Sequence, residues 1–505
     1  MLDVSCTWRQ MFGLLCLSLC WIASKAGYME DNFPASVIED GTLTTLQLLA
    51  KYKYPGEEHT VTTEDKYLLH VHRIPRPGAK PVLLVHGLQD ASSTWIMMGP
   101  HSGLGYFLYD NGYDVWMANV RGNRYSRGHL KLNPNTDKSY WSFSWHEIGF
   151  YDLPATIDAI LAKTGYSKLS YIGHSQGTTS FFVMASTRPE YNAKVHVMQA
   201  LAPVAFMTHV KAPLISVARS SMNILGDNFE VLPHSSLPTA QCMSSAIHLQ
   251  TCFYYIWLIL GKNPGEFNRT TTPVLMGQLP AGANSKQVRH YLQLQPTTRF
   301  GQYDYGPDNQ RIYGRATPPD YPLERITAPI GLYYAQNDYL SAVEDVQRLA
   351  KRLPNVVVNH LYANKKFNHV YMVWGITARR LAQPKFLEVM RLWEAGGPQN
   401  GTATTTEVIP TTTEDTEVAE EEDIPTEPTE MEQPTTEQSE IEQPSTEQLS
   451  TEQPSTEQPS TEQSEIEQSE MEQTERASTE KSETEQPEME KSESEQPDIE
   501  ENYAK

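Results

Sequence analysis

The sequence lacks any apolar stretch approaching the roughly 20 residues that a transmembrane helix requires, which excludes a membrane bundle. Cysteine is also scarce, with five in 505 residues, so the chain is not a small disulfide framework. Residues 399–505 contain no aromatic residue except Tyr503, so this stretch has little with which to build a core. These absences leave a globular protein of about 370 residues with a compositionally different tail.

The acidic balance of the chain belongs to the tail alone. Of the 62 acidic residues, 33 lie in residues 399–505 beside 4 basic ones, which leaves 36 basic and 29 acidic residues in 1–398. The motif PSTEQ recurs with a period of five from Pro444, as LSTEQ at Leu449. This composition predicts a disordered, O-glycosylated segment. It acts either as a mucin-like spacer that contacts matrix or mucus, or as a solvated extension with no specific partner.

The first 26 residues are typical of a signal peptide. An apolar run of 13 residues, 11–23, precedes small residues at Ser24 and Ala26, which suits cleavage before Gly27. An uncleaved anchor is the alternative, but the run is short for a membrane span. We therefore expect a secreted protein, with the lysosome as the alternative destination. After cleavage only Cys242 and Cys252 remain, and their spacing permits either a local bridge or two buried thiols.

Strand and helix patterns alternate through most of the chain, which predicts a mostly parallel, doubly wound α/β sheet. Apolar strands are expected at 81–86, 113–119, 169–173, 195–201, 330–334 and 356–361, with helices at 151–162, 177–186 and 343–353. We assign 27–203 and 311–398 to the two parts of this core. Residues 204–310 interrupt the alternation and are expected to form an inserted helical cap. Its apolar run 253–260 is either a buried cap helix or a surface that opens to meet lipid.

A candidate nucleophile lies between one strand and the helix that follows it. Residues 173–177, Gly-His-Ser-Gln-Gly, match G-x-S-x-G in a strand–turn–helix setting. A sharp turn there would push the Ser175 hydroxyl clear of the backbone, and the following helix would direct its N-terminus at a developing oxyanion. We therefore predict that Ser175 is a catalytic nucleophile.

The base and the acid follow from chain order, which in this fold runs serine, acid, histidine. Two histidines lie beyond the strand at 330–334, and His360 falls inside a strand pattern, so we choose His369 in a polar loop. Asp338 follows directly from that earlier strand and is the expected acid. Glu344 and Asp345 come later, in a predicted helix, and are expected at its surface or cap.

This arrangement requires two N–H donors for the tetrahedral oxyanion. We expect the backbone amide of Gln176, next to the nucleophile, and the amide of Leu88, which follows the first predicted strand. The mechanism needs no cofactor and no metal, and the remaining histidines show no ligand spacing.

Several longer motifs follow one another in order along the chain. They are Tyr52–His59 (YKYPGEEH), HGL at His86, Asn119–Asn123 (NVRGN), Phe143–Ala155 (FSWHEIGFYDLPA), GHSQGTT at Gly173, Ala200–Pro203 (ALAP), Tyr303–Gly306 (YDYG), Asn337-Asp338 and Phe367–His369 (FNH). On these motifs the sequence resembles the acid lipase family, which includes gastric lipase and lysosomal acid lipase, from about Val37 to Trp393.

The resemblance implies an α/β-hydrolase fold with a lipid-facing cap, and hydrolysis of triacylglycerols or cholesteryl esters. It places the triad on Ser175, Asp338 and His369, places the oxyanion donors on Leu88 and Gln176, and implies a cap disulfide between Cys242 and Cys252. Three positions depart from the family pattern. Lys66 stands where the family has Gly, Tyr339 replaces Trp, and Tyr371 replaces an acidic residue two positions after the base.

Two sequons predict N-glycosylation at Asn268 and Asn400. The expected partner is a lipid ester at an oil–water or membrane interface, and no nucleic acid is expected. Two other functions remain possible: a non-catalytic lipid carrier on the same fold, and a mucin-like matrix protein whose tail is the main functional part. An intact Ser175, Asp338 and His369 argues against a carrier, which has no need of all three.

Overall fold

The computed structural model describes residues 27–220, 226–262 and 264–398. The predicted signal peptide at 1–26, the tail at 399–505 and the sequon residue Asn400 lie outside these residues. Within the described ranges, no helix is both long enough and apolar enough to cross a bilayer.

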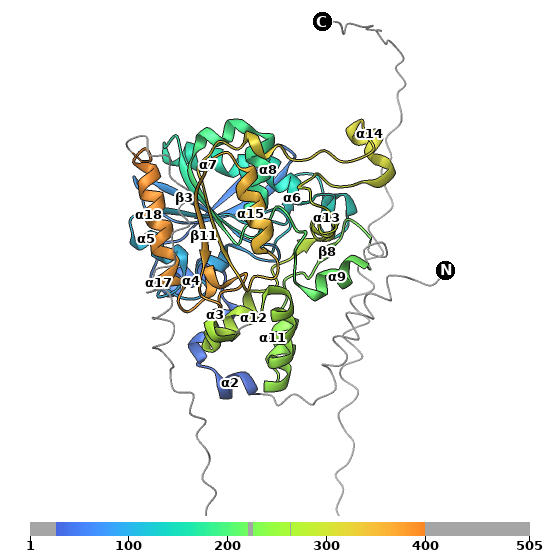
Figure 1. Ribbon diagram of the computed structural model, residues 1–505. Coiled ribbons are helices and arrows are strands. Elements are labelled where there is room, and N and C mark those ends of the chain that lie inside the picture. The colour runs from blue at the N-terminus through green and yellow to red at the C-terminus, as the bar shows by residue number, and fades with distance from the viewer. Residues whose placement is uncertain (1–26, 221–225, 263, 399–505) are drawn as a thin grey trace, which may run out of the picture. The chain divides into compact units, whose positions relative to one another are not determined.

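A mixed, mostly parallel sheet forms the centre of the fold (Figure 1). Its order is β1-β2-β4-β3-β6-β7-β10-β11, with β5 paired to β2. The pairs among β3, β4, β6, β7, β10 and β11 are parallel, whereas β1, β2 and β5 pair antiparallel. The strands are β1 Glu57–Thr62, β2 Tyr67–Ile74, β3 Pro81–Val85, β4 Asp114–Met117, β5 Gly128–His129, β6 Leu169–His174, β7 Val195–Leu201, β10 Ile330–Ala335 and β11 Val356–Tyr362. This confirms the predicted fold class, although the sequence analysis did not predict the antiparallel strands.

Helices pack on both faces of this sheet, and each face has its own hydrophobic core. Side chains of β3 alternate between the two cores: Leu83 and Val85 join one, and Val82 and Leu84 join the other. This alternation is what a strand buried on both faces requires. The helices that cover the sheet are α5 Leu104–Asp110, α7 Leu153–Thr164, α8 Gln176–Thr187, α15 Val343–Arg352 and α18 Gln383–Glu394.

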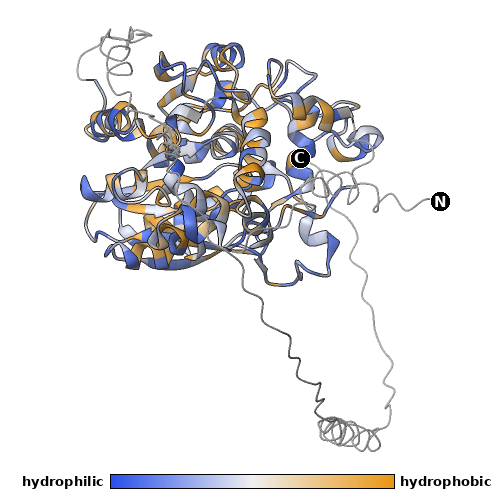
Figure 2. Ribbon diagram, turned by 90° about the horizontal axis from the view of Figure 1, so that it is seen from below, coloured by the Kyte–Doolittle hydropathy of each residue, from blue (hydrophilic) through white to orange (hydrophobic). Residues whose placement is uncertain are grey.

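Between β7 and β10 the chain leaves the sheet and forms mostly helices. These are α9 Pro213–Ser220, α10 Leu237–Cys242, α11 Ala246–Leu260, α12 Thr272–Gln278, α13 Ser285–Leu294 and α14 Asn309–Tyr313, with a small antiparallel pair, β8 Glu230–Val231 and β9 Ala283–Asn284. Figure 1 shows α11 and α12 at the end of the molecule where α2 (Tyr28–Asn32) and α3 (Ala35–Thr42) also lie. Figure 2 views that end. Hydrophobic and hydrophilic residues alternate along its helices, as expected for helices that are half-buried.

Helix α11 contains the apolar run 253–260, and it is neither fully buried nor fully exposed. Trp257 is buried, whereas 57% of the Tyr254 side chain is exposed. The helix begins at an N-cap, Ser245, whose hydroxyl accepts a hydrogen bond from the His248 amide. One side of α11 therefore packs inward and the other faces solvent.

The loop after β4 contains a fully buried cation, Arg121, which hydrogen-bonds to two carboxylates. Arg121 donates through Nε to Asp152 at 2.8 Å and through Nη2 to Asp65 at 2.8 Å, and its guanidinium lies 3.9 Å from the centre of the Tyr67 ring. Burial alone would lower the pKa of Arg121, but the two carboxylates raise it above its ordinary value. The cluster therefore joins the β1–β2 turn to Asp152, the N-cap residue of α7, through a single charged side chain.

The Lys66 substitution in that β1–β2 turn has a direct backbone consequence. Lys66 adopts a φ of 80°, and its amide donates to the Thr63 carbonyl at 3.0 Å. Only glycine reaches this left-handed conformation without steric cost, and this explains the glycine at this position in the family pattern.

Candidate active site

Ser175 lies at the turn between β6 and α8 with a strained backbone. Its φ of 51° and ψ of −116° lie outside the regions that side-chain-bearing residues prefer. The flanking glycines make the turn possible. A Cβ on Gly177 would lie 2.2 Å from the Val85 carbonyl oxygen, and one on Gly173 would lie 2.8 Å from the Gly177 carbonyl carbon. Both positions of the G-x-S-x-G motif therefore accept only glycine, and the serine is left half-buried at the sheet edge.

The structure brings the three predicted side chains into one hydrogen-bonded row. The Ser175 hydroxyl lies 2.8 Å from Nε2 of His369, and Nδ1 of His369 lies 2.9 Å from the Asp338 carboxylate. Asp338 and His369 are almost completely buried, at 0% and 2% exposed. One Asp338 oxygen also accepts the backbone amides of Leu340 and Ser341, each at 2.8 Å. The carboxylate is thus fixed in place before any substrate arrives.

These contacts determine which nitrogen of His369 carries the proton. Ionised Asp338 only accepts hydrogen bonds, so Nδ1 of His369 carries its proton and donates it to the carboxylate. Nε2 then has a free lone pair that accepts from the Ser175 hydroxyl. This tautomer allows His369 to take the serine proton as a general base.

A second histidine, His174, ties the serine turn to the loop of His369. Its Nε2–H donates to the His369 carbonyl at 2.8 Å. Burial and the neighbouring His369 ring lower the pKa of His174 to about 3, so its imidazole stays neutral. In the G-x-S-x-G motif this position is only the variable residue, and its buried hydrogen bond to a partner 195 residues away could not be predicted from the motif.

We expect His174 to weaken the fold at acidic pH. In the unfolded chain the imidazole takes up a proton as the pH falls below about 6.5, whereas in the fold it stays neutral down to about 3. The unfolded state therefore binds more protons in this window, and stability falls as the pH falls. At pH 4.5 this contribution is about 2–3 kcal/mol, at about 1.4 kcal/mol per pH unit.

Urea unfolding at pH 7 and pH 4.5 measures this contribution. His174→Gln keeps an N–H donor but does not titrate, so its free energy of unfolding should fall less between the two pH values than that of the wild type. An equal fall in both proteins would contradict the assignment.

The two expected oxyanion donors belong to segments that border Ser175. Gln176 begins α8, directly after Ser175, so its amide is one of the first-turn N–H groups without an intrahelical acceptor. Leu88 follows Gly87, and a Cβ on Gly87 would lie 3.3 Å from Cβ of Ser175. The loop after β3 thus lies directly against the serine turn.

The C-terminal end of α11 is attached to the loops that carry Asp338 and His369. The amide of His369 donates to the Leu260 carbonyl at 3.2 Å, and Asn368 donates to the Gly261 carbonyl at 2.9 Å. Gly261 has a φ of 109°, and a Cβ there would lie 1.9 Å from the Asn337 carbonyl oxygen. Only glycine fits this close approach between the insertion and the site.

The remaining sequence predictions can be located in the described residues. Cys242 and Cys252 form a disulfide with a Cα–Cα distance of 5.8 Å. Of the two alternatives that the spacing permitted, a local bridge or two buried thiols, the structure therefore has the bridge. His360 lies buried in β11, as expected for the histidine that was set aside. Asn268 is exposed before a short 3-10 helix, and its side chain caps that helix by accepting the Thr270 amide.

One expectation about the neighbouring acids is wrong. Asp345 was expected at a helix surface or cap, but it is 2% exposed. Its two carboxylate oxygens contact the backbone N–H and the Nδ1 of His209, both at 2.8 Å. This pairing removes Asp345 from the solvent. Tyr371, at the position where the family has an acid, is also buried, and its ring packs 5.8 Å from that of Trp257 in α11.

Comparison with known proteins identifies the family to which the chain belongs. The family described as alpha/beta hydrolase fold matches residues 80–367, and the family described as partial alpha/beta-hydrolase lipase region matches residues 45–99. Lipase 1 of Drosophila melanogaster is 42% identical over 75% of this chain and 88% of its own. Gastric triacylglycerol lipase of Bos taurus is 33% identical over 70% of this chain and 92% of its own.

A likeness to solved structures is more distant. Carboxylesterase CesB of Bacillus subtilis covers 72% of this chain and 98% of its own, at 12% identity and a TM-score of 0.41, which carries no argument by itself. The sequence matches are sufficient without it. This chain therefore belongs to the α/β-hydrolase family and, within it, to the acid lipases of the gastric type, which are carboxylic ester hydrolases.

Proposed function

We propose that this chain is a secreted or lysosomal lipase that hydrolyses the ester bonds of neutral lipids, triacylglycerols or cholesteryl esters, through an acyl-enzyme on Ser175. The observation that carries the proposal is the hydrogen-bonded row from half-buried Ser175 through His369 to Asp338, with both hydrogen bonds at 2.8–2.9 Å. A lipid carrier would need no such row.

In the first half of the reaction, His369 removes the proton of Ser175 as its oxygen attacks the ester carbonyl carbon. The carbonyl electron pair moves onto oxygen, and the amides of Leu88 and Gln176 receive this charge. His369 then returns the proton to the departing alcohol, and an acyl-enzyme remains. Throughout, Asp338 holds the imidazole in the required tautomer and stabilises its charged form.

In the second half, water takes the place of the alcohol. His369 removes a proton from the water as its oxygen attacks the acyl-enzyme carbonyl, and the same two amides receive the charge. The proton then returns to Ser175, and the fatty acid leaves. Apart from this water, the cycle uses only groups of the protein itself.

We assign the segment 204–310 the role of a cap that meets the lipid. Three features support this role. Helix α11 carries a solvent-facing aromatic and aliphatic side, its end is attached to the His369 loop, and its N-terminal part is bridged to α10 by the Cys242–Cys252 disulfide. The relatives' names, lipase and gastric triacylglycerol lipase, support a lipid ester such as a triacylglycerol as the substrate. We also assign N-glycans to Asn268 and Asn400.

The rate as a function of substrate concentration distinguishes a lipase from a short-chain esterase. We expect hydrolysis of emulsified triolein or cholesteryl oleate, and a rise in the rate for p-nitrophenyl butyrate once that ester exceeds its solubility limit. Saturation below that limit, with no activity on either emulsion, would indicate an esterase. Retention of lipid without any hydrolysis would indicate the carrier.

A further inference from the structure

His86 lies directly behind the loop that carries the proposed oxyanion donor Leu88. It follows β3, is 2% exposed, and places Nδ1 at 2.8 Å from the Gly87 carbonyl oxygen. Gly87 is also the residue at which an added Cβ would lie against Ser175. One histidine side chain therefore contacts the peptide that links the first predicted strand to the donor.

The neighbours of His86 determine its tautomer. Its Nε2 faces two N–H donors, the backbone amide of Val120 at 3.3 Å and Nδ2 of Asn123 at 3.1 Å. A nitrogen that receives two hydrogen bonds carries no proton, so the proton of the neutral ring lies on Nδ1. The Nδ1–H then donates to the Gly87 carbonyl. Burial lowers the pKa of His86 to about 4, which agrees with a neutral ring.

The amide of Asn123 is itself held in one orientation. Its Oδ1 accepts the backbone amides of Tyr125 at 3.0 Å and Ser126 at 3.1 Å. Its Nδ2 is therefore turned toward His86 and donates to it. A flipped Asn123 would place two N–H groups against these amides and an oxygen against Nε2, losing the bonds on both sides.

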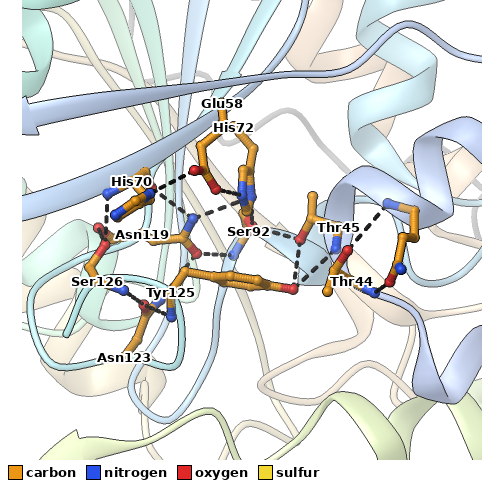
Figure 3. A network of polar contacts seen from close by, with 11 residues as sticks. Thr44, Thr45, Glu58, His70, His72, Ser92, Asn119, Asn123, Tyr125 and Ser126 are labelled. Atoms are coloured by element: carbon orange, nitrogen blue, oxygen red, sulfur yellow. Dashed lines mark hydrogen bonds and ion pairs between the residues drawn. The ribbon is translucent and has the colours of Figure 1, made fainter. Parts of the chain in front are cut away.

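A buried polar network extends this arrangement toward β1 and β2 (Figure 3). Oδ1 of Asn119 accepts from Asn123 at 3.1 Å and from the Ser92 amide at 2.8 Å. The Ser92 hydroxyl lies 2.6 Å from Nδ1 of His72, whose Nε2 lies 3.1 Å from Glu58. Because its members are linked to one another, the network fixes the orientation of Asn123 from several sides.

The geometry of a trans peptide carries the effect to the active site. In such a peptide the C=O and the following N–H point in opposite directions. When His86 holds the Gly87 carbonyl, it also fixes the direction of the Leu88 N–H. We propose that His86, kept in its Nδ1–H tautomer by Asn123, is a positioning residue that aims the Leu88 amide at the oxyanion. This inference rests on the proposed function, because it assigns His86 a part in stabilising that charge.

Two substitutions of His86 and one control test the proposal. His86→Leu removes the hydrogen bond to Gly87, whereas His86→Asn keeps an N–H donor close to the Nδ1 position. For p-nitrophenyl butyrate, we expect His86→Leu to lower kcat by about 10²–10³, the effect of losing one oxyanion donor, with KM unchanged. His86→Asn should recover most of that loss. The control is His360→Leu, which removes an equally buried imidazole from β11 and should leave kcat unchanged.

A second readout reports on the oxyanion itself. An alkyl trifluoromethyl ketone adds to Ser175 and forms a tetrahedral adduct with a negatively charged oxygen. Its inhibition constant should rise in His86→Leu in parallel with the loss of kcat, because transition-state analogues report transition-state binding. If His86→Leu does not fold, Asn123→Ala replaces it and should lower kcat by about 10-fold or more with KM unchanged.

The outcomes separate this inference from the proposed function. If hydrolysis persists in Ser175→Ala, the proposed function is wrong. If hydrolysis depends on Ser175 but His86→Leu keeps its kcat and inhibition constant, only the positioning role is wrong. The role is also overturned if His86→Leu changes KM alone, or if His360→Leu causes an equal loss of kcat.

Discussion

Ser175→Ala should lower the hydrolysis of p-nitrophenyl butyrate and emulsified triolein by about 10⁶-fold, the typical cost of removing the nucleophile of a triad. The reason is the geometry of the row: the hydroxyl oxygen lies 2.8 Å from Nε2 of His369, and alanine has no atom there. The measurement is kcat on both substrates, after ultracentrifugation and thermal unfolding have shown that the variant is folded.

The control for this substitution is Ser180→Ala, which removes a buried hydroxyl from the same helix, α8, without touching the row. It should retain the wild-type rate. Residual activity of Ser175→Ala within about 10-fold of the wild type would mean that another group attacks the ester, and the proposed function would have to be abandoned.

Arg121→Met is expected to have the largest effect on stability, about 3–5 kcal/mol, because it breaks a buried ion pair from one side. Asp152 and Asp65 would keep their carboxylates without the guanidinium that now contacts both. Asp152 is 1% exposed, so water cannot replace the lost partner without disrupting the packing. Urea denaturation at pH 7 measures the change in the free energy of unfolding.

A matched exposed pair shows whether burial is the cause. Arg311 lies 3.4 Å from Asp308, with both side chains largely in solvent. Arg311→Met should change stability by less than about 0.5 kcal/mol. Similar effects of the two substitutions would refute the argument that the cost comes from leaving buried carboxylates unpaired.

The turn that carries Ser175 could be predicted because its requirements fall on consecutive residues. Gly173 and Gly177 are forced by contacts within the turn and with β3, so the pentapeptide itself carries the information. The acid and base were placed by chain order, and the structure puts Asp338 and His369 within hydrogen-bonding distance of one another. The parallel strands β3, β4, β6, β7, β10 and β11 were predicted for a related reason, because strands inside a sheet that is covered on both faces read as apolar runs.

What could not be predicted depends on partners that are distant in sequence. Strand β2 contains His72 and Arg73, which make it look like a surface segment, yet both are buried. Their partners come from neighbouring strands: His72 contacts Glu58 of β1, and Arg73 contacts Glu57 of β1 and Asp114 of β4. Burial of this kind comes from pairing, and a hydrophobic pattern cannot report it.

The close contact between Gly261 and Asn337 limits how this protein could diversify or be re-engineered. The residues directly after α11 are bonded to the neighbours of Asp338 and His369, Lys262 to Asn337 and Gly261 to Asn368, and Gly261 fits against the Asn337 carbonyl. A cap taken from another family member therefore cannot be exchanged as an independent module with a junction at this point. The transplant would have to include residues 260–262 together with the loops around 337 and 368. Otherwise the foreign helix would displace the loops that carry Asp338 and His369.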